Sequence, residues 1–222
     1  MEQTLALDVY GTLIDPMGFV EDLRGRIGDD GAQFAALWRE KQIEYLFRRG
    51  LGRKYEPFSV CTRQALDYTR VVTKAKLREA DCAALMARYL DLPAYPGTAD
   101  ALAVLKRAGF SIYAFSNGEP DDLATLMDNA GLSDSLDGII SVHEVRSYKP
   151  DPSVYAFFLE NTGATLGNTW LVSANGFDVI GALQVGWKAV WVQRDLELQF
   201  DPWGIEPTAI VPELGELLAV LT

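Results

Sequence analysis

The sequence predicts an α/β fold in which a doubly wound parallel sheet carries a helical insertion after its first strand. Three observations lead to this prediction. A short apolar run, Thr4–Leu7, ends at Asp8 and a Gly-Thr turn. From Ala94 onward, apolar strand-like runs alternate with helical periods, which is the pattern of parallel βαβ units. Between these parts, residues 16–93 show helical patterns and no convincing alternating strand.

The part of the chain after the insertion supplies five further strand candidates and the helices between them. The strands are expected at Ser111–Phe115, Gly138–Val142, Trp170–Val172, Lys188–Gln193 and Ala209–Val211. The helices are expected at Asp100–Arg107, Asp121–Asn129, Pro152–Asn161, Val179–Gln184 and Glu213–Leu221. Glycine follows several of these helices, as is common just past a last helical turn. With the first strand, this pattern predicts about six strands in a Rossmann-like sheet.

The insertion is expected to form a helical cap. Its helical periods cover Ala32–Arg49, Ser59–Val72 and Lys74–Leu90. Chain order places it between the strand that delivers Asp8 and the strand that delivers Ser116. Ligands of open parallel sheets bind beyond the carboxyl ends of the strands, so a cap here would cover the site and exclude water. We expect a core of residues 1–15 and 94–222 and a cap of residues 16–93.

Composition limits the partners of this chain. Its 222 residues, 49% of them hydrophobic, suffice for one large domain or a core with a modest insertion. A net charge of −11 disfavours nucleic acid and anionic membranes, because phosphates are bound by an excess of Lys and Arg. No apolar run approaches the ~20 residues of a membrane span, and the amino terminus lacks a signal-peptide pattern. We therefore expect a cytoplasmic protein.

The cysteine and histidine content excludes several mechanisms. Cys61 and Cys82 form no Cys-x-x-Cys pattern and are expected to be reduced thiols in helices. The single histidine, His143, excludes Ser-His-Asp catalysis and His-ligated metals unless it acts alone. It follows a strand-like run, and we expect it to be solvated at the strand end.

Polar residues stand at the turns where a catalytic crevice would need them. Asp8 is placed as a carboxylate nucleophile at a strand tip. Ser116 and Asn117 end a later strand and precede a helix, where turn amides bind anions. Lys149 stands before a proline at a loop-to-helix junction, and a lysine near a carboxylate lowers the pKa of that carboxylate. Ser173, Asn175 and Asp178 follow a third strand.

These segments together resemble the haloacid dehalogenase superfamily. Asp8-Val-Tyr-Gly-Thr-Leu is similar to its first motif, and Tyr10 is the residue that its carbon–halogen-hydrolysing branch carries where phosphatases have a second aspartate. The strings at Lys149 and at 173–178 are similar to the third and fourth motifs. Leu-Trp-Arg-Glu-Lys-Gln-Ile-Glu-Tyr, around Arg39, resembles a dehalogenase stretch. The resemblance covers essentially the whole chain and is to the type II L-2-haloacid dehalogenases.

The resemblance implies roles for the matching residues. Asp8 would attack a 2-halocarboxylate and form an ester, while Arg39 and Asn117 stabilise the departing halide. Water would then attack the ester and release a D-2-hydroxy acid. The residues implied to hold the Asp8 carboxyl group and the water are Lys149, Asn175 and Asp178, with Ser173 supporting Lys149. Thr12 and Ser116 would bind the substrate carboxylate, and Tyr10 and Tyr155 would shape and polarise the pocket. Further pocket residues implied in the same way are Ile43, Phe58 and Phe177, although Phe58 fits a core position nearly as well.

The resemblance also implies what the site lacks. Phosphatases of the superfamily have aspartates where this chain has Tyr10 and Ala174, so the negative charges that Mg²⁺ needs are missing and no metal or other cofactor is expected. Family members are commonly homodimers. Two positions depart from the family pattern, because Glu40 stands in place of glutamine and Phe177 in place of tryptophan.

Three alternatives remain open at this point. Relatives with very similar motifs open the ring of azetidine-2-carboxylate, and Glu40 could suit the amine of such a substrate. A magnesium-dependent phosphatase is disfavoured by Tyr10 and Ala174. An α/β binding module without turnover is disfavoured because the motif residues are all present.

Overall fold

The computed structural model describes residues 3–221 and contains a six-stranded sheet in the order β3-β2-β1-β4-β5-β6, with all neighbours parallel. The strands are β1 (Thr4–Asp8), β2 (Ser111–Ser116), β3 (Gly138–Ser141), β4 (Thr169–Ser173), β5 (Lys188–Val192) and β6 (Ala209–Val211). The chain runs from β1 outward to β3 and then crosses to β4. The strand order therefore reverses beside β1, which is where parallel sheets bind ligands. The predicted doubly wound sheet is confirmed.

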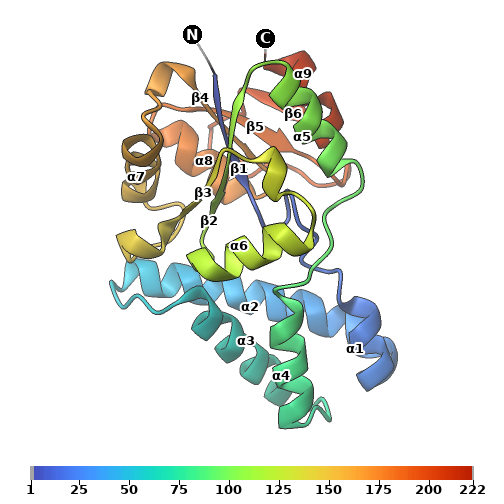
Figure 1. Ribbon diagram of the computed structural model, residues 1–222. Helices are drawn as coiled ribbons and strands as arrows, with labels where there is room; N and C mark the ends of the chain where they lie inside the picture. The colour runs from blue at the N-terminus through green and yellow to red at the C-terminus, as the bar shows by residue number, and fades with distance from the viewer. Residues whose placement is uncertain (1–2, 222) are drawn as a thin grey trace.

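Helices cover both faces of the sheet. They are α5 (Thr98–Arg107), α6 (Pro120–Asn129), α7 (Pro152–Thr162), α8 (Gly176–Gln184) and α9 (Leu217–Val220). Figure 1 shows α7 and α8 on one side of the sheet and α5 and α9 on the other. The central strands β1 and β4 are fully buried between these helices, as their apolar runs require.

The segment between β1 and α5 is helical, as expected. Its helices are α1 (Val20–Ile27), α2 (Gly31–Leu51), α3 (Phe58–Val72) and α4 (Glu79–Arg88). They lie together beyond the carboxyl end of β1 (Figure 1). The buried indole of Trp38 joins α2 to α3 by donating a 2.9 Å hydrogen bond to the Thr62 carbonyl. We refer to α1–α4 as the helical layer.

Several element boundaries differ from the sequence expectation. Helix α1 lies within the segment expected to be helical but was not predicted as a separate helix, because it is only eight residues long and half of them are charged. Helix α4 begins at Glu79 rather than Lys74, since Lys74 adopts a left-handed φ of 56°. The expected helix Glu213–Leu221 is a 3-10 turn followed by the short α9.

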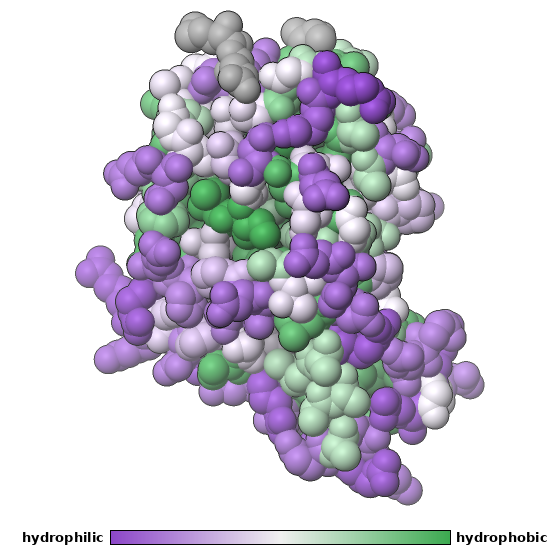
Figure 2. Space-filling model, viewed as in Figure 1, coloured by the Kyte–Doolittle hydropathy of each residue, from purple (hydrophilic) through white to green (hydrophobic). Residues whose placement is uncertain are grey.

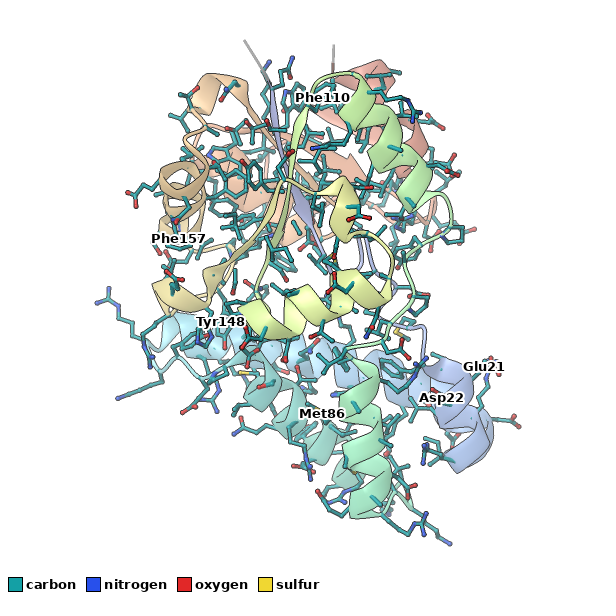
Figure 3. The ribbon with its side chains drawn as sticks, in the orientation of Figure 1. Glu21, Asp22, Met86, Phe110, Tyr148 and Phe157 are labelled. Atoms are coloured by element: carbon teal, nitrogen blue, oxygen red, sulfur yellow. The ribbon has the colours of Figure 1, made fainter. Side chains whose placement is uncertain are left out.

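Contacts at the amino-terminal end of α3 join the helical layer to the sheet. Tyr148, labelled in Figure 3, donates a hydrogen bond to the Glu56 carbonyl, and its hydroxyl lies 3.5 Å from the Cys61 sulfur. His143 was expected to be solvated, which is wrong. It is half-buried, and its Nδ1 lies 2.8 Å from the Tyr55 hydroxyl because the strand ends in a 3-10 turn.

The predicted state of the cysteines is confirmed, since Cys61 and Cys82 are free and buried in helices. On the face in Figure 2, polar side chains cover most of the helical layer, and a pale apolar area lies over α4, where Ala83 and Ala87 are exposed. Within residues 3–221, no helix has the length and apolar character needed to cross a membrane.

Candidate active site

The side chain of Asp8 is held by hydrogen bonds at the tip of β1. Gly11 turns the chain just after it with a φ of 98°, which favours glycine. The Oδ2 atom of Asp8 accepts hydrogen bonds from the Thr12 hydroxyl at 2.9 Å, the Ser173 hydroxyl at 3.2 Å and the Asn175 amide at 2.7 Å. Two βα turns, after β1 and β4, thus supply the three donors to one carboxylate oxygen.

The other oxygen of Asp8 faces a buried lysine. The ammonium of Lys149 lies 3.3 Å from Asp8 Oδ1, 2.8 Å from Asp178 Oδ2 and 2.8 Å from the Phe115 carbonyl oxygen. The ammonium also lies 4.1 Å from the centre of the Phe115 ring. Two carboxylates therefore share one buried cation, and the cluster of Asp8, Lys149 and Asp178 carries a net charge of −1 when all three groups are ionised.

Asp178 is the most deeply buried member of this cluster. The Tyr155 hydroxyl donates a 2.8 Å hydrogen bond to Asp178 Oδ1. Burial raises the pKa of Asp178, and the neighbouring Asp8 charge adds to this, whereas Lys149 and Tyr155 favour the ionised form. Burial likewise raises the pKa of Tyr155 far above its ordinary value, so that its hydroxyl stays a donor.

A pocket of about 20 Å³ lies over Asp8, between the strand tips and the helical layer. Its lining residues are Asp8, Tyr10, Arg39, Ile43, Leu46, Phe47, Phe58, Ser116, Asn117, Asn175 and Phe177. The rings of Tyr10 and Phe58 are stacked, with their centres 5.0 Å apart. The rings of Phe47 and Phe177 meet edge to face, with their centres 4.9 Å apart. A volume this small has room for about one water molecule.

The polar groups of the pocket suit an anion. Arg39 donates to the Gln42 side-chain oxygen at 2.7 Å and to the Tyr10 carbonyl at 3.3 Å, and no carboxylate within residues 3–221 pairs with it. The Asn117 side-chain oxygen accepts from the Lys149 N–H at 2.9 Å, which leaves its NH₂ group for the pocket. The Ser116 oxygen accepts from the Gly118 N–H at 3.2 Å and keeps its own proton to donate.

The structure brings the expected residues together, but five of them are buried and do not line the pocket: Thr12, Lys149, Tyr155, Ser173 and Asp178. Three of these five make contacts other than the expected ones. The Thr12 hydroxyl is buried between Asp8 Oδ2 and the Ala174 N–H at 2.9 Å, so it does not reach a substrate carboxylate as expected. Ser173 contacts Asp8 instead of Lys149. Tyr155 contacts Asp178 instead of lining the pocket.

Glu40 follows the pocket residue Arg39 in the sequence and was considered as a partner for a substrate amine, but it does not line the pocket. It is exposed and lines a different groove with Arg26 and Lys76, because adjacent residues of a helix point about 100° apart. Phe177 does line the pocket. Sequence reasoning missed Leu46 and Phe47, although their spacing from Arg39 and Ile43 on one helix face could have identified them.

The side chains of the site, among the described residues, are not arranged as ligands of a metal ion. Its carboxylates are Asp8 and Asp178, and the Lys149 ammonium lies between them. Across residues 3–221, no three His, Cys, Asp or Glu side chains converge as metal ligands do.

Comparisons with known sequences agree with this geometry. The family model of the haloacid dehalogenase-like hydrolases matches residues 2–186. The chain is 34% identical to an (S)-2-haloacid dehalogenase of Xanthobacter autotrophicus over 98% of its own length and 94% of the relative. It is 31% identical to haloacetate dehalogenase H-2 of Moraxella sp. (strain B), over 99% and 97% of the two chains.

Comparison with solved structures leads to the same family. The L-2-haloacid dehalogenase of Xanthobacter autotrophicus with chloropropionic acid covalently bound superposes with a TM-score of 0.93. The two sequences are 32% identical, and the alignment covers 100% of this chain and 98% of the other.

Proposed function

This chain belongs to the haloacid dehalogenase-like hydrolase family, and from that premise we propose that it hydrolyses L-2-haloalkanoic acids to D-2-hydroxy acids and halide. The reaction would proceed through an ester on Asp8. Residues 16–93 would act as a cap that closes over the substrate. The observation that carries the proposal is the unequal environment of the two Asp8 oxygens, of which one accepts from three donors and the other faces Lys149.

In the first step, Asp8 Oδ1 is the attacking atom. Its electron pair forms a bond to the substrate Cα from the side opposite the halogen, and the carbon–halogen bond breaks with its electrons on the halide. Oδ2 does not attack, because three donors already occupy its lone pairs. The Lys149 ammonium, 3.3 Å from Asp8 Oδ1, holds the attacking carboxylate in place. This displacement inverts the substrate carbon.

Arg39 and the Asn117 NH₂ group would stabilise the departing halide. Arg39 lines the pocket from α2 and Asn117 from the turn after β2, and donors already in place at a developing charge require no rearrangement during the reaction. The Ser116 hydroxyl and the turn amides that follow it would hold the substrate carboxylate. The apolar walls from α2 and α3 exclude water from the carboxylate nucleophile.

In the second step, water attacks the ester carbonyl carbon of Asp8. The negative charge then develops on Oδ2, where Thr12, Ser173 and Asn175 donate. Asp178, ionised and held by Lys149 and Tyr155, would take the proton of the water. Collapse of the intermediate breaks the bond between the Asp8 carbonyl carbon and Oδ1, and Oδ1 takes up the proton held by Asp178. The hydroxy acid therefore leaves with the original Asp8 oxygen.

Ring opening of azetidine-2-carboxylate receives less support than dehalogenation. The residue that favoured it, Glu40, faces away from the pocket, and the pocket's charged residues are Asp8 and Arg39. The pocket therefore offers no second carboxylate beside Asp8 to pair with a cationic amine, and its other charged residue, Arg39, would repel that amine.

The proposed function is tested by halide release from each enantiomer of 2-chloropropionate, with wild-type protein and the Asp8→Asn variant. We expect chloride from the L form with wild type and none with the variant. Folding of the variant is checked by circular dichroism. Wild-type protein that is folded but releases no halide from either enantiomer would overturn the proposal, and azetidine-2-carboxylate would be assayed next.

A further inference from the structure

Gln42 is a fully buried polar residue next to the pocket, yet it does not line the pocket. It lies one helical turn after Arg39 on α2. Its side-chain oxygen accepts a 2.7 Å hydrogen bond from Arg39 Nη1, and its NH₂ group donates to the Thr62 hydroxyl on α3. The Thr62 hydroxyl in turn donates to the Phe58 carbonyl at 2.8 Å. The side-chain oxygen and nitrogen of Gln42 and the hydroxyl of Thr62 are thereby all paired.

An amide at this place has a different electrostatic effect from a carboxylate. Both can accept from a guanidinium, but a carboxylate would form an ion pair and cancel the charge of Arg39. Gln42 and the Tyr10 carbonyl are neutral acceptors, so they fix the orientation of the guanidinium and leave its positive charge available to the pocket. These two contacts occupy two of the five N–H groups of Arg39, and the others remain for an anion.

We propose that Gln42 is a positioning residue for the carbon–halogen cleavage step. It holds the Arg39 guanidinium toward the departing halide without neutralising it. This inference rests on the proposed function of the site. The same amide also ties Arg39 to the first turn of α3, where Phe58 forms the pocket wall, so the cation and the apolar wall keep a fixed relation.

The inference predicts how the leaving group changes the effect of a substitution. Gln42→Met keeps the length of the side chain, removes the acceptor for Arg39, and leaves Thr62 paired with the Phe58 carbonyl. Chloride is a poorer leaving group than bromide and depends more on the cation. We expect kcat/KM to fall about tenfold for L-2-chloropropionate and about threefold for L-2-bromopropionate, as misplacement of a catalytic group does.

A second variant tests the charge argument separately. Gln42→Glu keeps an acceptor for Arg39 but adds the negative charge that cancels it. We expect the same rise in the bromide-to-chloride ratio of kcat/KM, together with weaker inhibition by added chloride. In an Arg39→Met background, neither substitution should change the ratio further, because the group that Gln42 positions is gone.

Gln64→Met is the matched control. Gln64 lies on α3 and accepts a 2.7 Å hydrogen bond from Arg49, the same kind of contact at an exposed place away from the pocket. The Gln64→Met substitution should leave kcat/KM unchanged for both L-2-chloropropionate and L-2-bromopropionate. Equal losses for the two halides in Gln42→Met and Gln42→Glu, or no loss in either, would overturn the inference. Absence of halide release from wild-type protein would instead refute the proposed function.

Discussion

The ammonium of Lys149 lies 2.8 Å from the Asp178 carboxylate, and both side chains are buried. The same ammonium also faces Asp8, so one cation serves two carboxylates that have different proposed tasks. Asp8 has to be an ionised nucleophile, and Asp178 has to accept a proton. A single lysine between them provides the charge for the first task while burial raises the pKa of the second group.

The first prediction concerns the pH dependence of ester hydrolysis. Because burial raises the pKa of Asp178, this group is protonated at pH values where an ordinary aspartate is ionised. Hydrolysis of the ester should therefore slow as the pH falls through the raised pKa, and Asp178→Asn should accumulate the ester at every pH. Single-turnover measurements between about pH 4 and about pH 8 would show this, with the ester detected by mass spectrometry.

Stability should change in the opposite direction over the same range. Between the unfolded and folded pKa values of Asp178, the folded protein keeps a proton that the unfolded chain has released. The stability from this group is therefore present at low pH and lost as the pH rises, by about 1.4 kcal/mol for each unit by which the pKa is raised. The contribution is isolated by measuring the free energy of unfolding in urea for wild type and for Asp178→Asn at each pH and subtracting the second value from the first. A difference that does not vary with pH would contradict the raised pKa.

Removal of the shared cation should be costly. Lys149→Met leaves two neighbouring buried carboxylates without a cation between them, so their mutual repulsion is no longer offset and Asp8 loses the group that holds its Oδ1. We expect loss of detectable halide release and a fall in the free energy of unfolding of about 3 kcal/mol. Lys106→Met is the control, since Lys106 pairs with Asp137 at 2.6 Å where both side chains are about one-third exposed. Its cost should stay below about 1 kcal/mol.

The size of the pocket predicts a limit on substrate chain length. Phe47 and Phe177 line the pocket and meet edge to face, with their ring centres 4.9 Å apart. We expect kcat/KM to fall from chloroacetate to L-2-chlorobutyrate, and Phe47→Ala to reduce this difference by about tenfold. Leu51→Ala is a suitable control, because Leu51 lies one turn further along α2 and is 91% exposed. A preference unchanged by Phe47→Ala would show that other groups set the limit.

Halide release should not depend on a divalent cation. Tyr10 and Ala174 stand where the resemblance places metal-binding or acidic residues in phosphatases, and Lys149 occupies the space between the two carboxylates. Rates with EDTA and with added Mg²⁺ should agree within error. A rate that falls on chelation and returns with Mg²⁺ would favour the phosphatase alternative.

The sequence predicted the sheet well because its signals are local. Each apolar run is bounded by turn residues, and strand ends carry the polar groups of the site, so Asp8, Asn175 and Asp178 could be placed before any contact was known. Helix α1 was missed as a separate helix because its signal is short, with eight residues of which four are charged.

Side-chain direction could not be predicted in the same way. Thr12 and Ser173 belong to matching motifs, but whether a hydroxyl faces the pocket or Asp8 depends on how two βα turns approach each other. The i, i+3 spacing places Gln42 on the same helix face as Arg39, but its contact with Thr62 could not be predicted, because that contact joins two helices. Glu40, which is close to Gln42 in the sequence, is the reverse case: it was considered as a partner for a substrate amine, but it lines a different groove and not the pocket.

The ester on Asp8 is tested most directly by isotope transfer in a single turnover. Enzyme in excess is mixed with L-2-chloropropionate in H₂¹⁸O, and the lactate formed is analysed by mass spectrometry. We predict that the lactate contains ¹⁶O taken from Asp8 and that the label enters the Asp8 carboxylate. Lactate carrying ¹⁸O, with an unlabelled Asp8, would show that water attacks the substrate directly and would contradict the mechanism.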